Sequence, residues 1–261
     1  MRNLILLSFF ITSNLYAIFN GQSLEDSDLL SKSLVALQVA NPEKAGIVYY
    51  KSSGVVLGKR AILSAAHTFY YRNPAAEVWA IFSTNPSWGP DKGTEERIKV
   101  ARIELHPDFY MTATGTENDV AVLFLEEDIP DTYRPLRLAK QSDIAPAQGS
   151  HLMIAGYGRS QENPGPSDFR LRVAVRPIVS SPETKEPVPG SKLWVDQRSG
   201  GFCGGDSGGP ALLQSAQELI IYGIAIHPGR DENNELSCLT KGAYTRVQFY
   251  EDWLDSVGTS R

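Results

Sequence analysis

Three segments of this chain carry side chains that could cooperate in nucleophilic catalysis. Residues 205–210 read Gly-Asp-Ser-Gly-Gly-Pro, which sets a serine among glycines directly after a carboxylate. Such a backbone can turn sharply, leave the hydroxyl exposed and point N–H groups at a developing oxyanion. Residues 65–67 read Ala-Ala-His, and residues 118–122 read Asn-Asp-Val-Ala-Val. A nucleophile, a base and an acid that can orient the base are therefore all present.

Each of these side chains has a specific role in the predicted chemistry. A serine hydroxyl is a poor nucleophile near neutral pH and needs a base, which in turn needs a partner that orients it. His67 is the expected base, because imidazole titrates near working pH. Asp119 is the expected orienting group, and Ser207 is expected to attack a carbonyl carbon. The backbone N–H groups of Gly205 and Ser207 are expected to receive the oxyanion.

The same residues also have purely structural interpretations. His67 follows an apolar run and could be a packed side chain, Asp119 could cap a turn, and Ser207 could lie in an ordinary glycine turn. Of the other histidines, His106 is expected in a surface turn and His151 at the start of a strand.

Short apolar runs bounded by turn residues dominate the chain and predict β-strands. The runs cover residues 33–39, 46–50, 54–57, 60–65, 78–82, 98–105, 120–125, 152–155, 171–179, 192–195, 219–226 and 242–247. Many short strands and few helices indicate an all-β barrel or sandwich. Residues 128–150 are polar and contain three prolines, which is typical of a connection between two halves. Apolar residues at helical spacing over 247–257, followed by Gly258, predict a short C-terminal helix.

The composition limits the kind of protein. The 261 residues are 42% hydrophobic, which suffices for one or two compact domains, and a net charge of −5 argues against a nucleic-acid partner. Residues 1–17 combine a charged start, a short apolar stretch and a final alanine, which is typical of a secretory signal peptide, with an N-terminal core strand as the alternative. No later segment is long and apolar enough to cross a membrane. We therefore expect a soluble, exported protein with no membrane partner.

Taken together, these segments resemble the trypsin/chymotrypsin family of serine endopeptidases, and the resemblance covers nearly all of the chain after residue 17. It implies an all-β fold of two six-stranded antiparallel β-barrels with a short C-terminal α-helix. The first barrel is expected over about residues 30–135 and the second over about 136–261, within a peptidase domain of residues 18–261. His67 and Asp119 are then expected from the first barrel and Ser207 from the second. A monomer that cleaves peptides or proteins and needs no cofactor is expected.

The resemblance also predicts how the enzyme becomes active. Members of the family mature when a new N-terminal amine pairs with the carboxylate before the nucleophile, here Asp206. Residues 18–21 read Ile-Phe-Asn-Gly directly after the predicted cleavage site at Ala17. We therefore expect that signal removal itself frees the Ile18 amine, that this amine forms an ion pair with Asp206, and that the oxyanion hole becomes ordered. The alternative is that Ile18 merely begins an edge segment and cleavage occurs elsewhere.

The two cysteines, Cys203 and Cys238, form an even set in an exported protein and suggest a disulfide, with two free thiols as the alternative. The resemblance identifies this pair as the family's bridge near the nucleophile. The family's usual cysteine after the histidine is absent, because Thr68 stands there.

Specificity is expected to differ from that of trypsin. Trypsin has an aspartate six residues before the nucleophile, where this chain has Gly201. Phe202 is expected to narrow the pocket and Gly242 to leave its wall open, so we predict a neutral pocket for apolar or small side chains. Residues 226–228 read Ile-His-Pro where the family usually has Ser-Trp-Gly, and the proline lacks an N–H for pairing with an extended substrate.

Two other functions and one metal site are alternative interpretations of the sequence. A non-catalytic binding module of the same fold is the main alternative, motivated by residues 226–228, but the complete set of three catalytic residue types argues against it. An esterase or lipase of another fold is disfavoured by the chain order His, Asp, Ser. A calcium site at Asp91, Glu95 and Glu96 has no distinctive ligand spacing, so a solvated acidic loop is favoured and no metal is expected.

Overall fold

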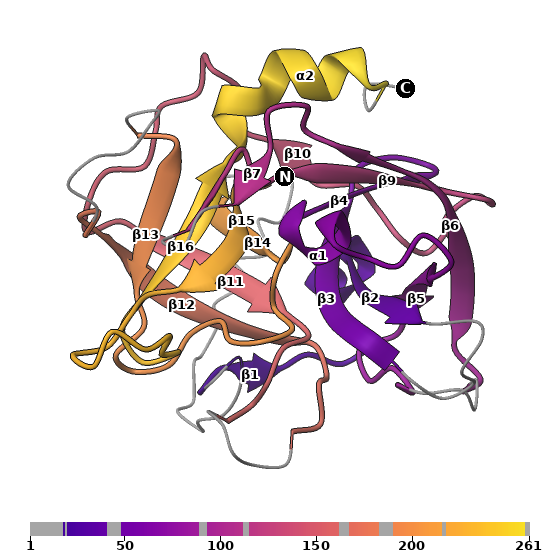
Figure 1. Ribbon diagram of the computed structural model, residues 1–261, viewed down its shortest axis with the longest axis horizontal. Coiled ribbons are helices and arrows are strands. Elements are labelled where there is room, and N and C mark those ends of the chain that lie inside the picture. Colours follow the sequence, from indigo (N-terminus) through magenta and orange to yellow (C-terminus); the bar gives the residue numbers. More distant parts are fainter. Residues whose placement is uncertain are drawn as a thin grey trace, which may run out of the picture.

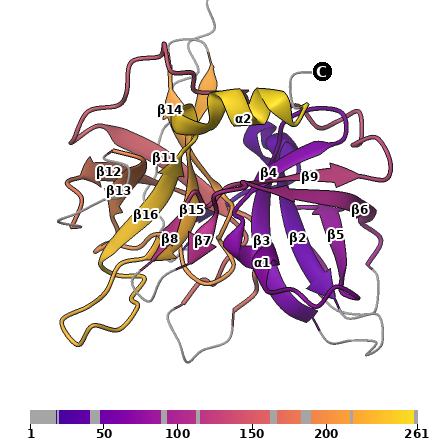
Figure 2. The same cartoon turned by 45° about the horizontal axis from the view of Figure 1, so that its top comes forward.

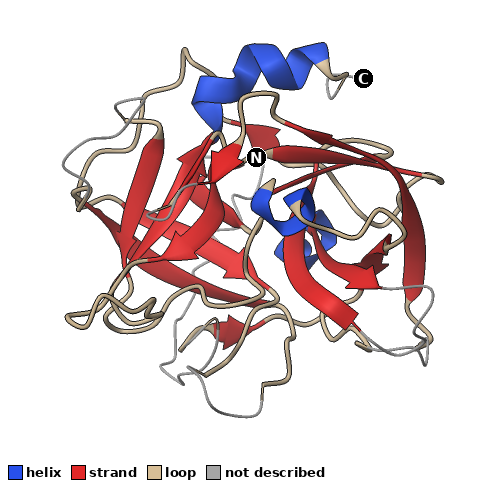
Figure 3. Ribbon diagram, viewed as in Figure 1, coloured by secondary structure: helices blue, strands red, loops and turns tan. Residues whose placement is uncertain are grey.

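The computed structural model describes residue 18 and residues 20–40, 48–88, 93–111, 115–161, 167–182, 190–215 and 218–258. The predicted signal peptide therefore lies outside the described residues. Strands make up most of the ordered structure (Figure 3), and they form two barrels that lie side by side, one violet and one orange in Figure 1.

The first barrel is closed by six strands. In spatial order they are β2 (Leu34–Ala40), β3 (Val48–Val56), β4 (Ala61–Ser64), β9 (Ala121–Leu125), β6 (Glu96–Leu105) and β5 (Glu77–Phe82), with β5 pairing back onto β2. Every pairing is antiparallel. A closed barrel leaves no exposed strand edge, and its inward-facing apolar residues fill the interior.

The second barrel is also closed by six antiparallel strands. They are β11 (His151–Gly156), β12 (Arg172–Val179), β13 (Lys192–Asp196), β16 (Lys241–Arg246), β15 (Leu219–Pro228) and β14 (Pro210–Gln214), with β14 pairing back onto β11. Two short strands extend this sheet, because β1 (Gln22–Ser23) pairs with β12 and β10 (Arg137–Leu138) pairs parallel to β15. The predicted fold class is thus confirmed.

Some elements differ from the predicted runs. Residues 48–50 and 54–56, from two separate predicted runs, belong to one continuous strand, β3, in which the serines between them are buried, while residues 46 and 47 lie outside the described residues. Strand β14 was not predicted, because it begins at Pro210 directly after the glycine-rich turn, and these residues were interpreted as part of the turn. The small ribbon β7 (Tyr110–Met111) and β8 (Thr116–Glu117), and the short helices η1 (Leu29–Ser33) and α1 (His67–Tyr70), are likewise too short for a sequence pattern to reveal.

The predicted C-terminal helix is present as two pieces. A 3-10 turn, η2 (Val247–Tyr250), leads into α2 (Glu251–Ser256), which lies across one end of the molecule in Figures 1 and 2. Leu254 is buried, and Gly258 takes a left-handed φ of 89° just after the helix, as a helix stop requires.

The two barrels share one apolar core at their interface. Leu63 and Val122 of the first barrel belong to the same buried cluster as Ile154 and Ala211 of the second. Burial of apolar surface between the barrels stabilises the folded state by roughly 25 cal/mol per Å² and holds the two barrels in a fixed relative orientation. Side chains that project from the two barrels toward this interface therefore have fixed relative positions.

Candidate active site

His67, Asp119 and Ser207 lie at the interface between the barrels and form a continuous row of hydrogen bonds. Asp119 Oδ2 is 2.7 Å from His67 Nδ1, and His67 Nε2 is 2.9 Å from Ser207 Oγ. The second carboxylate oxygen of Asp119 accepts a hydrogen bond of 2.8 Å from the backbone N–H of His67. The imidazole is therefore held on two sides by one carboxylate, with its far nitrogen directed at the serine hydroxyl.

Local structure explains how His67 reaches this place. Strand β4 is buried along its whole length, and the chain that follows it approaches the second barrel, where a Cβ on Gly208 would lie 3.0 Å from the Ala65 backbone nitrogen. Helix α1 starts at His67 itself, immediately after the buried Ala65 and Ala66. Two small residues before the histidine let the backbone pass close to the second barrel, and the imidazole remains partly exposed.

Asp119 is positioned by an unusual backbone turn. Asn118 has a left-handed φ of 51°, which asparagine tolerates better than most residues. Its side chain is fixed on both sides, since Nδ2 donates to the Asp108 carbonyl and Oδ1 accepts from the Tyr250 hydroxyl. The turn directs Asp119 inward, where it is fully buried.

Two threonines hold the buried Asp119 in place. The Thr116 hydroxyl donates a hydrogen bond of 2.9 Å to Asp119 Oδ2, the same oxygen that faces the imidazole. From the second barrel, the Thr245 hydroxyl donates to the Asp119 backbone carbonyl at 3.0 Å. Neither threonine was singled out from the sequence, because a lone hydroxyl in a strand carries no recognisable motif.

The titration of this pair follows from its surroundings. Burial alone lowers the pKa of His67, but the charge and hydrogen bond of Asp119 together raise it by more, so the net pKa lies above 6.5. For Asp119, burial raises the pKa, but His67 and the Thr116 hydroxyl lower it further, so its net pKa lies below 3.8. An ionised carboxylate beside an imidazole with an elevated pKa is an arrangement suited to accepting a proton.

The loop around Ser207 has the geometry of an anion site. Gly205 and Gly208 have left-handed φ angles of 100° and 82°, and a Cβ on Gly208 would lie 2.1 Å from the Ser64 hydroxyl. Among the residues that the structure describes, none accepts a hydrogen bond from the backbone N–H of Gly205 or Ser207. These two donors are therefore available to an oxyanion that forms next to the serine.

Ser53 on β3 links this loop to the first barrel and was missed from the sequence. Its backbone N–H donates to the Ser207 carbonyl at 2.8 Å, and its hydroxyl donates to the Gly205 carbonyl at 3.0 Å. The same hydroxyl accepts from the Tyr157 N–H at 2.9 Å. Two adjacent serines, Ser52 and Ser53, in the middle of strand β3 were the available signal for such a polar contact.

Asp206, the carboxylate before Ser207, is fully buried. Its two oxygens accept hydrogen bonds from the Gly158 N–H at 2.6 Å and the Cys203 N–H at 2.8 Å. Burial raises the pKa of Asp206 to about 7, although these two hydrogen bonds oppose the shift. A Cβ on Gly158 would lie 2.2 Å from the carboxylate, so this glycine is required for the close approach.

Ile18, the other member of the predicted activation pair, is 1% exposed and belongs to the apolar cluster between the barrels. In the full chain it follows Ala17, so its nitrogen is an uncharged peptide group. Within the described part of the chain, the hydrogen bonds to the Asp206 carboxylate come from Gly158 and Cys203 and none comes from Ile18. The ion pair of the mature protein therefore stays a prediction.

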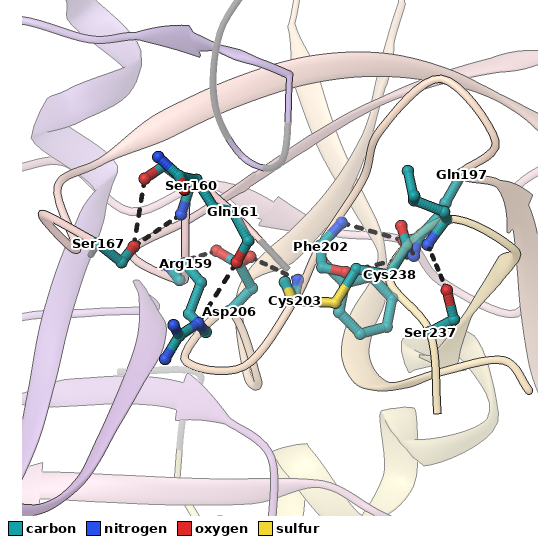
Figure 4. The surroundings of a disulfide bond; sticks show 12 residues. Arg159, Ser160, Gln161, Ser167, Gln197, Phe202, Cys203, Asp206, Ser237 and Cys238 are labelled. Atoms are coloured by element: carbon teal, nitrogen blue, oxygen red, sulfur yellow. Dashed lines mark hydrogen bonds between the residues drawn. A yellow bond between two sulfur atoms is a disulfide. The ribbon is translucent and has the colours of Figure 1, made fainter. Parts of the chain in front are cut away.

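The predicted disulfide between Cys203 and Cys238 is present (Figure 4). It joins the segment before Ser207 to the segment that leads into β16. The three residues predicted to line a specificity pocket, Gly201, Phe202 and Gly242, meet nearby around the side chain of Gln197, which the sequence did not single out.

Among the described residues, no group of three or more His, Cys, Asp or Glu side chains is placed to hold a metal ion. Glu95 instead pairs with Arg97 at 2.5 Å and accepts from the Ser87 N–H, while Glu96 begins β6 as an exposed residue. Asp91 lies outside the described residues. No helix in the described part of the chain is long and apolar enough to span a membrane.

Comparison with known proteins identifies the relatives of this chain. The trypsin family model matches residues 28–254. Trypsin eta of Drosophila erecta is 28% identical over 214 residues, which cover 78% of this chain and 76% of the relative. Serine protease 1 of Rattus norvegicus is 24% identical, covering 90% of this chain and 92% of the relative. Urokinase-type plasminogen activator of Gallus gallus is 26% identical over 75% of this chain, which spans only 48% of that relative's length. With its two barrels and a family match over most of its length, the chain belongs to the trypsin family of serine-type endopeptidases.

Proposed function

We propose that the mature chain hydrolyses peptide bonds through a covalent acyl-enzyme on Ser207, with His67 as general base and Asp119 as the orienting carboxylate. The observation that supports this most directly is the unbroken row of hydrogen bonds of 2.7 and 2.9 Å from carboxylate to imidazole to hydroxyl. The non-catalytic alternative would not require such a row.

The first half of the reaction forms the acyl-enzyme. Ser207 Oγ attacks the carbonyl carbon of the substrate, and its proton moves to His67 Nε2. The carbonyl oxygen becomes negative and accepts hydrogen bonds from the N–H groups of Gly205 and Ser207, which are worth roughly 3–4 kcal/mol each to the transition state in related sites. The C–N bond then breaks, and His67 returns the proton to the leaving amine.

The second half regenerates the enzyme. Water takes the place of the departed amine, His67 accepts one of its protons, and the resulting hydroxide attacks the ester carbon. The ester bond to Ser207 breaks, and the serine oxygen recovers its proton from His67. Throughout, the ionised Asp119 keeps Nδ1 protonated and stabilises the imidazolium that forms twice in the cycle.

The substrate backbone has a place to pair beside the nucleophile. The pairing of strand β14 with β15 ends at Pro210 and Ile224, before residues 226–228 of β15. An extended peptide can add there as a further strand. Because Pro228 offers no N–H, we expect this enzyme to hold substrate backbones with fewer hydrogen bonds than its relatives do.

Maturation by signal removal belongs to the same proposal. After cleavage behind Ala17, the Ile18 amine pairs with Asp206, and the protein is secreted in an active form. The burial of both partners supports this. N-terminal sequencing of active protein tests it: the expected first residue is Ile18, and any other start removes the mechanism.

A fluorophosphonate probe tests the catalytic proposal. We expect covalent labelling of wild-type mature protein at Ser207 and none of the Ser207→Ala variant. Ser64→Ala, which alters another buried hydroxyl near the site, serves as a control that should retain labelling. If wild-type protein that begins at Ile18 is not labelled and cleaves no peptide, the binding-module alternative is correct instead.

A further inference from the structure

Gln197 is a buried amide among the three residues predicted to line the specificity pocket, Gly201, Phe202 and Gly242. It follows β13 and is 0% exposed. Its Oε1 accepts from the Phe202 N–H at 3.0 Å, while Nε2 donates to the carbonyls of Phe202 at 3.2 Å and Cys238 at 3.4 Å. Figure 4 shows this side chain directed at the Phe202 backbone, next to the disulfide.

These hydrogen bonds fix the side chain. Both N–H donors and the oxygen of the amide have partners, so no polar atom of Gln197 is left unsatisfied. If the amide moved away, it would lose all three hydrogen bonds and leave buried backbone groups of Phe202 without partners, which is costly in a dry interior. Gln197 is therefore part of a rigid wall and not a side chain that swings aside.

Two glycines make room for this amide. A Cβ on Gly201 would lie 2.4 Å from Gln197 Cδ, and a Cβ on Gly242 would lie 2.3 Å from Gln197 Oε1. The same Cβ on Gly242 would lie 2.4 Å from Cε1 of Phe202. The sequence predicts an open wall at Gly242, but the space above it holds the protein's own side chains.

The Phe202 ring fills the remaining volume. It is 1% exposed and packs edge-on against Tyr244 with ring centroids 5.1 Å apart. A ring that lined an open pocket would be in contact with solvent, so this low exposure indicates that the floor is filled. Phe202 also lies next to Cys203, whose disulfide restricts any shift of this segment.

We propose that Gln197 and Phe202 together close the specificity pocket from its floor, so that the enzyme cleaves after glycine, alanine or serine and excludes larger side chains. This inference rests on the proposed peptidase function and narrows its substrate class. Gln197 acts as the specificity-determining residue: its neutral amide gives lysine or arginine no counter-charge, and its volume excludes leucine and phenylalanine.

The first experiment uses wild-type mature enzyme and peptide substrates that differ only in the residue before the cleaved bond. We expect kcat/KM for alanine to exceed that for leucine, phenylalanine and lysine by about 100-fold or more, since even one excess methylene can cost 10–200-fold in a filled pocket. Peptide boronic acids with alanine or phenylalanine at this position should differ in Ki in the same direction. Equal rates or equal inhibition across these side chains would overturn the inference.

The second experiment enlarges the pocket. Gln197→Ala is expected to raise kcat/KM for leucine relative to alanine by at least about 10-fold, and Phe202→Ala to extend acceptance to phenylalanine. Gln248→Ala is the matched control, because Gln248 is also buried and donates from Nε2 to two backbone carbonyls, those of Lys140 and Asp143, in another part of the fold. The control should leave the substrate profile unchanged. An unaltered profile in Gln197→Ala that folds and is labelled contradicts the role assigned to Gln197.

Fluorophosphonate labelling distinguishes an open specificity pocket from the absence of peptidase activity. Labelling with a broad substrate profile leaves the peptidase function intact and refutes the closed pocket. Failure of wild-type mature protein both to label and to cleave any peptide refutes the peptidase function and this inference with it. If the Gln197→Ala variant does not fold, the wild-type rates and boronic acid Ki values alone decide the question.

Discussion

The buried carboxylate of Asp206 gives a quantitative prediction about maturation. In a chain whose Ile18 nitrogen is still a peptide group, the pKa of Asp206 is raised by burial from 3.8 to about 7. The folded state then retains a proton that the unfolded chain releases above pH 4. Stability is fully present below the unfolded pKa and is lost as the pH rises through the folded one. Three pKa units correspond to about 4 kcal/mol.

A free amine at Ile18 should remove this loss. The positive charge of the amine beside the carboxylate favours its ionised form and lowers the pKa of Asp206, so the protein no longer gains from keeping the proton. We therefore expect the free energy of unfolding of the mature form to stay nearly constant between pH 4.5 and 7.5, in the range where the extended form loses about 3 kcal/mol. At higher pH the mature form should weaken as its amine deprotonates.

The assay is urea unfolding of two proteins at several pH values. One begins at Ile18 and the other carries a short neutral extension before it, and both contain Ser207→Ala so that neither degrades itself. Asp206→Asn in the extended protein is the control, because the amide cannot titrate and the pH dependence should flatten. A parallel pH dependence of the unfolding free energy in the extended and mature proteins would contradict the raised pKa of Asp206. So would an extended Asp206→Asn protein whose unfolding free energy still falls with pH as in the extended parent.

Three further predictions concern the positioning of the site. Ser53→Ala leaves the Tyr157 N–H and the Gly205 carbonyl without a partner. The free energy of unfolding, measured by chemical denaturation, should therefore fall by about 1–3 kcal/mol, and labelling of Ser207 should slow. The control is Ser52→Ala, because the buried Ser52 hydroxyl has no partner among the described residues; this variant should lose less unfolding free energy and keep the wild-type labelling rate. Thr116→Val removes a charged hydrogen bond from Asp119, so kcat should drop by about 10-fold with little change in KM, and a return of activity in Thr116→Ser would identify the hydroxyl as the cause. Because the pKa of His67 lies above 6.5, kcat/KM should fall about tenfold per pH unit below that pKa; a flat acid profile would argue against His67 as the base.

The fold was predictable where one local pattern sufficed. Alternating apolar residues indicated most strands of both barrels, and helical spacing at 247–257 indicated the C-terminal helix. Strand β14 was not predicted, because its Pro210 directly follows a glycine turn. Four further strands, β1, β7, β8 and β10, were not predicted because each is only two residues long. Closure of each sheet into a barrel came from the family resemblance, because pairing between distant strands leaves no mark on local periodicity.

The site was predictable to the extent that its chemistry requires particular residue types. Imidazole, carboxylate and hydroxyl have few substitutes, so His67, Asp119 and Ser207 were recognisable from short segments. The residues that position them were not, because a hydroxyl or amide in the right place can come from almost any element. Ser53 donates to the Gly205 carbonyl, 152 residues away, and Gln197 donates to the Cys238 carbonyl, 41 residues away, and such contacts emerge only from the assembled barrels.

The apolar cluster that spans the two barrels limits how this enzyme can evolve and be engineered. A hybrid that combined one barrel of this chain with the other barrel of a distant relative would have to match side-chain volumes across a buried surface, and not merely conserve a few reactive groups. Mutations on one side of that surface that alter packing, such as at Leu63, should therefore require compensating changes among the cluster members of the other barrel, which include Ile154. We expect the two halves of this chain to vary in concert, as parts of a single folding unit.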